Sequence, residues 1–214
     1  MTELKINIDK DFDVSYGNGN IEDSVFTFES KRFSDDRGDF KEFWKENELT
    51  GRFANLGWVK QCNMSKSMMN VFRGMHAQRG GSSQGKFVSC SHGAVMDVIV
   101  DMRPKSCTFR TIKTYYLSFE NCLSLWVPRG FLHGFLSLSD NTVFQYLCDS
   151  TYDKSSECGA NIFSILDDDM ICNFSDSCHK GFMSMLKSQF IMSEKDKALP
   201  SIVEFEKNEL GVTR

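Results

Sequence analysis

Two of the four histidines lie in local surroundings that suit chemistry. His76 lies in the stretch Arg73–Gln78, and His133 lies in the stretch Pro128–Phe135. In each stretch a glycine two or three residues earlier lets the backbone pass close to a neighbouring strand or a ligand. Because an imidazole titrates near neutral pH, it can act as a base or bind a metal ion. A lone histidine in a strand is more often a core residue, but two in such contexts favour a functional site.

The metal-binding alternative is the weaker one. The stretch P-x-G-x-x-H at Pro128–His133 matches half of the metal-ligand pattern of cupin proteins. The other half requires H-x-H followed by a glutamate, and this chain reads His76-Ala77-Gln78. A divalent transition ion normally takes three or four histidine, cysteine or carboxylate ligands. We therefore expect no metal at this position.

The elements that position these side chains read as strands. In Val95–Met102 apolar residues occupy every second position and Asp97 and Asp101 lie on the alternate face, a period of two. Similar runs predict strands at Thr108–Leu117, Leu123–Val127, Phe131–Leu138 and Thr142–Cys148, with two more at Ser24–Phe33 and Asn63–Arg73. Turn signals separate the runs without an intervening helical pattern, which indicates an all-β sandwich or barrel.

Length and composition fit one ordinary globular domain. The chain has 214 residues, 41% of them apolar, and shows no sharp boundary or internal repeat. We expect a single domain over 1–214, with N-terminal strands at about 24–73, a barrel core at about 74–153 and a C-terminal segment at about 154–200. Glu46–Leu56 fits a short helix or loop, and Lys180–Phe190 fits a short helix.

Charge and cysteine content exclude several classes. The formal charge of −4 argues against general nucleic-acid binding, although a local basic pocket remains compatible with it. No run of 18 apolar residues and no secretory signal are present, so we expect a cytoplasmic protein without a membrane helix. None of the eight cysteines forms a C-x-x-C pair, and most should be free thiols.

Several motifs resemble those of dTDP-4-dehydrorhamnose 3,5-epimerases, a family of cupin-type sugar epimerases. F-R-G-M-H-A-Q at 72–78 resembles L-R-G-L-H-x-Q, and Q-G-K-F-V at 84–88 resembles Q-G-K-L-V. L-W-V-P-R-G-F-L-H-G-F at 125–135 resembles L-W-I-P-x-G-F-A-H-G-F, and S-E-K-D at 193–196 resembles the late L-S-x-K-D. The resemblance implies a cupin jelly-roll β-barrel (a double-stranded β-helix) with a short C-terminal helical segment. It also implies a homodimer, a nucleotide-diphosphate 4-keto-sugar substrate, and no metal or other cofactor.

This chemistry explains the catalytic residues that the resemblance implies. A 4-keto group acidifies the C–H bonds at C3 and C5, so inversion requires a base, an enolate stabiliser and an acid on the opposite face. His76 matches the base, and Asp196 matches the carboxylate that orients it. Lys86 can balance the charge on O4, with His133 nearby, and Tyr146 matches the phenolic acid.

The resemblance also implies a set of substrate-binding residues. Arg37 and Arg73 can grip the diphosphate through bidentate guanidinium bonds. Phe40 or Tyr152 can stack on the base or the sugar. The complete expected set is Arg37, Phe40, Glu42, Gln61, Asn63, Ser65, Arg73, Gln78 and Tyr152.

Three departures from the family leave the substrate open. Arg79–Ser83 stands where prolines are usual, Arg129 stands at an acidic or small position, and Cys158–Asn161 replaces part of E-R-G-I-R-W. A GDP-linked or other nucleotide sugar, a longer heptose, and inversion at C3 alone all remain open. So do two other functions, a 3,4-ketoisomerase and a non-catalytic sugar-binding module. Tyr146 together with Lys86 favours epimerisation over migration of the keto group. His76, Lys86 and Tyr146 argue against a binding module, because such a module needs no base and acid pair.

Overall fold

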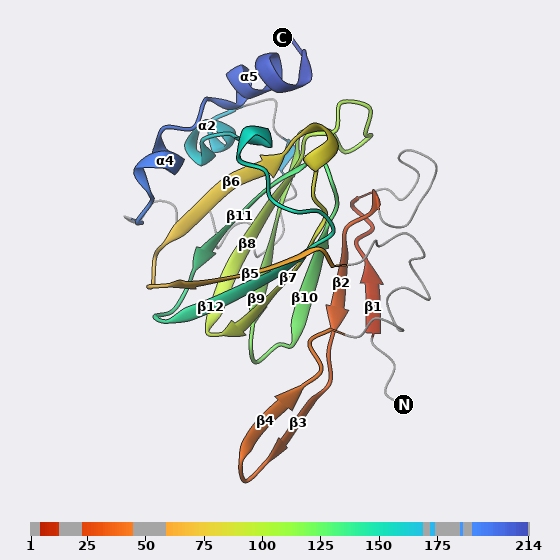
Figure 1. Ribbon diagram of the computed structural model, residues 1–214, viewed down its shortest axis with the longest axis vertical. Helices are drawn as coiled ribbons and strands as arrows, with labels where there is room; N and C mark the ends of the chain where they lie inside the picture. The colour runs from red at the N-terminus through yellow and green to blue at the C-terminus, as the bar shows by residue number, and fades with distance from the viewer. Residues whose placement is uncertain are drawn as a thin grey trace.

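Two six-stranded sheets pack face to face and form the body of the molecule (Figure 1). The computed structural model describes residues 5–12, 23–44, 59–168, 172–173, 185 and 190–213. The first sheet has the order β1 (Lys5–Ile8), β2 (Phe26–Glu29), β10 (Leu123–Val127), β7 (Lys86–His92), β12 (Thr142–Cys148) and β5 (Gln61–Ser67). The second has the order β13 (Glu157–Gly159), β6 (Phe72–Gln78), β11 (Phe131–Ser137), β8 (Ala94–Asp101), β9 (Thr111–Ser118) and β14 (Cys172–Asn173).

Two smaller parts extend this body. Strands β3 (Arg32–Asp35) and β4 (Gly38–Lys41) form a separate hairpin that projects from one end (Figure 1). Helices α2 (Ile162–Leu166), α4 (Glu194–Lys197) and α5 (Ile202–Phe205), with the π-helical turn η4 (Glu206–Leu210), cover the other end. The observed architecture confirms the predicted all-β jelly-roll barrel with a short C-terminal helical segment.

The side chains of strand β8 alternate between two buried faces of the sheet. Val95 and Ile99 point between the sheets, while Val98 and Val100 pack on the opposite face against α2 and α5. The two faces therefore belong to two hydrophobic cores, and residues 95–101 of the strand are buried on both sides. Asp97 shares the face that points between the sheets and is fully buried. A charged side chain at such a position needs a partner, which the site described below supplies.

Buried ion pairs hold the C-terminal segment against the barrel. Arg110, in the loop before β9, makes two hydrogen bonds to the fully buried Glu206, at 2.8 and 2.9 Å. Ser201 caps α5 and forms a capping box with Glu204. These contacts compensate for the shortness of the helices, which are too short to be stable alone. They fix the segment that carries Asp196.

Two predicted strands are each divided by a turn. The predicted strand Ser24–Phe33 is β2 and the start of β3, separated at residues 30–31. The predicted strand Asn63–Arg73 is the end of β5 and the start of β6, separated by a turn at Asn70 with a left-handed φ of 63°. The Met69 amide in this turn donates to Asp140, 3.0 Å away. These turns lack glycine and proline, so the sequence showed no break there.

The predicted strand Thr108–Leu117 begins three residues later, at Thr111. The hydroxyl of Thr108 donates to the buried carboxylate of Asp101 at 2.6 Å, and that of Ser106 donates to the same oxygen at 2.7 Å. Side-chain bonds of this kind hold the backbone in turns and delay the strand. The predicted strands Leu123–Val127 and Thr142–Cys148 have the observed bounds.

Some of the remaining predictions concern residues that the structure does not describe. The segment Glu46–Leu56 and most of Lys180–Phe190 lie outside them. Five cysteines are free thiols, as expected: Cys62, Cys90, Cys122, Cys148 and Cys158. No helix in the described parts of the chain is long and apolar enough to cross a membrane.

Candidate functional site

Two adjoining hollows of about 290 and 300 Å³ open between the sheets and share His76, Lys86 and Tyr146. The first is completed by Arg73, His133, Gly134, Phe135, Ser193, Lys195 and Asp196. The second is completed by Gln61, Asn63, Ala77, Gln78, Gln84, Tyr152 and Glu157. The three shared residues come from strands β6, β7 and β12, so the pocket lies at the junction of the two sheets.

The histidines and the tyrosine stand on different walls. His76 on β6 and His133 on β11 belong to the second sheet and are paired directly across these two strands. Lys86 on β7 and Tyr146 on β12 belong to the first sheet. The pocket therefore presents imidazoles on one side and an amine and a phenol on the other. A ligand between the sheets can meet a base and an acid on opposite faces.

Close approach of β6 and β11 sets the histidines side by side. A Cβ atom added to Gly74 would lie 2.7 Å from Cα of Gly134 and 2.8 Å from the carbonyl oxygen of His133. Gly74 also has a φ of +122°, which other residues rarely adopt. The structure thus confirms that the glycine before His76 allows a close backbone contact.

His76 is joined to a carboxylate from the C-terminal segment. Its Nε2 lies 2.7 Å from Oδ1 of Asp196 on α4. Ser193 caps α4 and accepts a hydrogen bond from the Asp196 amide at 3.1 Å. Burial raises the pKa of Asp196, but the hydrogen bond and charge of His76 outweigh it and lower that pKa below its ordinary value. Asp196 is thus an anion that can orient the imidazole and stabilise its protonated form.

His133 has its own carboxylate, deeper in the barrel. Its Nε2 lies 2.8 Å from Oδ1 of Asp97 on β8. Burial raises the pKa of Asp97, while the nearby charges of His133 and Lys86 oppose the shift. Burial likewise lowers the pKa of Lys86, opposed by Cys148 and Asp97. The sequence marked Asp97 as a strand residue but gave no sign that it would pair with His133.

Tyr146 carries a phenol that stays protonated. Burial raises its pKa, and Cys148 adds to this effect while Arg73 opposes it. A neutral phenol on the wall opposite His76 has a proton to give to a carbanion.

The second hollow contains four of the nine residues expected to bind substrate: Gln61, Asn63, Gln78 and Tyr152. The side chain of Gln61 donates to Asn63 at 2.8 Å and accepts from the backbone amide of Tyr152 at 2.7 Å. Gln78 accepts from the Asp153 amide at 3.0 Å. Ser65 does not line either hollow, and its hydroxyl lies 3.5 Å from the carbonyl oxygen of Phe144. These amides are fixed by the backbone before any ligand arrives.

Two charged lining residues were not predicted. Lys195 contacts both carboxylate oxygens of Glu157 at 2.6 Å, and the Tyr152 hydroxyl donates to Glu157 at 2.8 Å. The motif S-E-K-D placed Lys195 near Asp196 in sequence, but Glu157 comes from β13 and only the fold brings it here. This ion pair links the walls of the two hollows.

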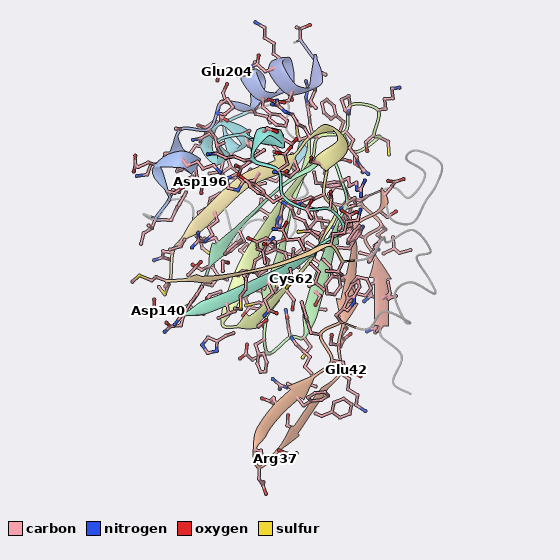
Figure 2. The ribbon with its side chains drawn as sticks, viewed as in Figure 1. Arg37, Glu42, Cys62, Asp140, Asp196 and Glu204 are labelled. Carbon is pink, nitrogen blue, oxygen red and sulfur yellow. The ribbon has the colours of Figure 1, made fainter. Side chains whose placement is uncertain are left out.

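Arg37, Phe40 and Glu42 do not reach the pocket within one chain. Figure 2 shows Arg37 at the tip of the β3–β4 hairpin and Glu42 at its base, far from Asp196. The Arg37 guanidinium pairs with Asp35 at 2.6 Å. A role for these three residues in substrate binding would therefore need a second copy of the chain.

The departures from the family lie around the pocket. Arg79 pairs with Glu209 at 2.5 Å and donates to the carbonyl of Ser155, so its charge is directed to the C-terminal segment and not to a ligand. Arg129 pairs with Asp149 at 3.0 Å. Within the described ranges no group of three histidine, cysteine or acidic side chains is placed to hold a metal ion. That the reaction needs no metal stays a prediction.

A jelly-roll barrel with two imidazoles on one sheet and an amine and a phenol on the facing sheet fits the class of cupin-type sugar epimerases. The sequence model described as dTDP-4-dehydrorhamnose 3,5-epimerase matches residues 20–204. The chain belongs to this family, and it is an isomerase.

Named relatives agree with this assignment. The chain is 45% identical to the dTDP-4-dehydrorhamnose 3,5-epimerase of Escherichia coli K12 over 139 residues, which cover 65% of this chain and 75% of the relative. The crystal structure of the enzyme of this name from Elizabethkingia anophelis is 33% identical, with a TM-score of 0.73 over 95% of this chain and 98% of that one. ChmJ, a 3'-monoepimerase from Streptomyces bikiniensis solved with dTDP-quinovose, is 26% identical, with a TM-score of 0.72 over 88% of each chain.

Proposed function

We propose that the chain inverts both C3 and C5 of a dTDP-linked 4-keto sugar. The observation that carries this proposal is the placement of His76 and Tyr146 on facing sheets, with Lys86 beside both. Relatives named for the 3,5-epimerase reaction support the choice of nucleotide and of both carbons. The reaction serves the biosynthesis of a deoxy sugar for a surface polysaccharide, in the cytoplasm.

The proton transfers follow from the two walls. His76 removes the proton at C3 or C5 and becomes an imidazolium that Asp196 stabilises. The electron pair moves to O4, where the Lys86 ammonium and His133 offset the negative charge. Tyr146 then gives its phenolic proton to the other face of the same carbon, which inverts it. Solvent returns a proton to Tyr146 and takes one from His76, so both groups are reset for the second carbon.

Inversion at C3 alone is the second candidate. It is favoured by the similarity to ChmJ, whose name records a single inversion. The two candidates share the same base, acid and enolate, so they differ in how the sugar sits after the first inversion. The position of deuterium in the product separates them.

We also propose a homodimer in which the β3–β4 hairpin of one copy reaches the pocket of the other. Phe33 and Phe40 on this hairpin are 42% and 64% exposed in one chain, an apolar surface that a second copy would cover. The arrangement would bring Arg37, Phe40 and Glu42 to the substrate. Deletion of the hairpin should give a monomer with a weakened affinity for the nucleotide. A dimer with unchanged affinity would contradict the proposal.

Deuterium incorporation tests the proposed reaction. The wild-type chain is incubated in D2O with dTDP-, GDP-, UDP- and CDP-linked 4-keto sugars, and C3 and C5 are read by NMR. We expect inversion with deuterium at both carbons of the dTDP sugar. Migration of the keto group would identify a ketoisomerase, and binding without exchange would identify a sugar-binding module.

The variant Tyr146→Phe separates abstraction from inversion. Because His76 and Lys86 remain, the enolate should still form, and His76 should return deuterium to the face from which the proton came. We expect deuterium incorporation with little inversion. The ring keeps nearly the same volume, so loss of packing should be small. Inversion at the wild-type rate would make Tyr146 a packing residue.

A further inference from the structure

The Asp97–His133 pair is buried in the wall of the barrel, beside Lys86. Asp97 is 0% exposed and His133 is 8% exposed. Oδ1 of Asp97 contacts Nε2 of His133, and Oδ2 has no hydrogen-bond partner among the described residues. Tyr115 pairs with Asp97 across β8 and β9, but its hydroxyl donates to Asp9 instead, at 2.6 Å. His133 is therefore the one hydrogen-bonding partner that this carboxyl group has in the described structure.

The number of protons on this pair follows from its burial. With two protons, the pair is either a carboxylate and an imidazolium or a carboxylic acid and a neutral imidazole, and it carries no net charge in both cases. With one proton, it is a buried anion, which burial disfavours. The raised pKa of Asp97, caused by burial, points in the same direction. The charge of Lys86 reduces the penalty for the anion, but Oδ2 of Asp97 still lacks a hydrogen-bond partner among the described residues.

Both two-proton forms leave a hydrogen on Nδ1 of His133. Nε2 faces Asp97, and His133 lines the pocket, so Nδ1 is the nitrogen that a ligand can meet. We propose that Asp97 is a positioning residue that keeps the His133 ring in this orientation with a hydrogen on Nδ1, so that His133 donates to the enolate oxygen beside Lys86. This inference rests on the proposed function, and it gives His133 a fixed role as a donor rather than as a second base.

The ring protonation can be measured without substrate. The protein is labelled with 15N-histidine, and the signals of His133 are assigned by their loss in His133→Leu. At neutral pH we expect a hydrogen on Nδ1 of His133 in the wild-type chain. A bare Nδ1 would overturn the proposal. This measurement is independent of the epimerase reaction, so it stands even if no 4-keto sugar proves to be a substrate.

Two substitutions of Asp97 separate positioning from packing. Asp97→Leu removes every hydrogen bond to Nε2, and we expect kcat to fall ~10²–10³-fold, the loss typical of one oxyanion donor, with KM little changed. Asp97→Asn can donate its amide hydrogen to Nε2, which again leaves the hydrogen on Nδ1. It should therefore be at least ~10-fold faster than Asp97→Leu. Equal losses in the two variants, or a rise in KM alone, would contradict the proposal.

A double-variant cycle shows whether Asp97 acts through His133. In Asp97→Leu/His133→Leu both partners of the buried bond are apolar, so the double variant should be at least as stable as His133→Leu. The kcat of the double variant should equal that of His133→Leu. If Asp97 acts only through His133, its removal costs nothing more once His133 has been replaced. If the fold-decrease in kcat of the double variant equals the product of the fold-decreases of the two single variants, Asp97 acts independently of His133. Thermal melting of all variants restricts the comparison to folded proteins, and the 15N measurement decides the question if Asp97→Leu does not fold.

Discussion

The molecule contains two histidine–aspartate pairs with nearly equal bond lengths and very different surroundings. His76 and Asp196 are 29% and 6% exposed, and the aspartate comes from a helix 120 residues further along the chain. His133 and Asp97 are 8% and 0% exposed, and they lie on the neighbouring strands β11 and β8. The first pair thus stands at the rim of the pocket, and the second lies in the wall of the barrel.

The difference shows how the same two side chains can serve two tasks. A base must exchange its proton with substrate and solvent, so the rim position suits His76. A donor to an oxyanion must keep its hydrogen and its direction, and the interior position suits His133. The anchoring differs as well, because the β8–β11 ladder holds both members of the interior pair, while the rim pair joins strand β6 to the short helix α4. Substitutions in the rim pair should therefore alter proton transfer with little effect on the barrel.

Loss of the rim base should have the largest effect. His76→Asn keeps a similar size and removes the proton acceptor, so we expect kcat to fall ~10²–10⁴-fold. Because His76 is partly exposed and outside the main cores, the melting temperature should change little. Steady-state kinetics and thermal melting measure both. Turnover near the wild-type rate would show that the two pairs do not divide the work in this way.

Loss of the rim carboxylate should have a smaller effect. Asp196→Asn leaves the imidazole in place but removes the charge that orients it and stabilises its protonated form. We expect kcat to fall about 10²-fold or less, the low end of the range for general-base catalysis. The matched interior variant is Asp97→Asn. It should lower the rate of deuterium exchange at the carbons that His76 deprotonates and the rate of inversion by the same factor, so that their ratio does not change. If Asp196→Asn has no effect, Asp196 is only part of the polar C-terminal segment.

The fall of kcat at high pH (the alkaline limb of its pH profile) should show which of the two histidine–aspartate pairs affects the pKa of Lys86. Burial lowers the pKa of Lys86, so its ammonium form is lost as pH rises through that lowered value and activity falls. Asp97 opposes this shift, so Asp97→Leu should move the limb to lower pH, while Asp196→Asn should leave it in place. Lys86→Arg is the control, because a guanidinium stays charged and should move the limb upward. If Asp196→Asn shifts the alkaline limb and Asp97→Leu does not, the pKa of Lys86 is set by the His76–Asp196 pair, which would contradict this expectation.

The sequence revealed one pair better than the other, for physical reasons. His76 and Asp196 each lie in a family motif, so both could be named before the fold was known. Asp97 also lies in a stretch, G-A-V-M-D-V at 93–98, that resembles G-x-V-x-D-V of the family, but its partner was not predicted, because the pairing depends on the register of β8 against β11. The same reason applies to Glu157, which only the fold places beside Lys195. Alternation along strands thus predicts which face a residue occupies, but not its neighbour across the ladder.

The β3–β4 hairpin shows the opposite case, in which residues expected at the substrate lie away from the pocket. The resemblance implied that Arg37, Phe40 and Glu42 contact the substrate, and the structure places them away from the pocket of their own chain. The missed turns at residues 30–31 and at Asn70 have a simpler cause, since neither contains glycine or proline.

Removal of metal ions should have the smallest effect of all. In both pairs the imidazole Nε2 already contacts a carboxylate, at 2.7 Å for His76 and at 2.8 Å for His133. A divalent ion would have to displace an aspartate or rely on the two remaining ring nitrogens, too few for a site that normally needs three or four ligands. We therefore expect full activity after dialysis against EDTA and no stoichiometric zinc, iron or manganese by elemental analysis. Loss of activity that is restored by one of these ions would mean that the histidines are ligands, and the division between a rim base and an interior donor would be wrong.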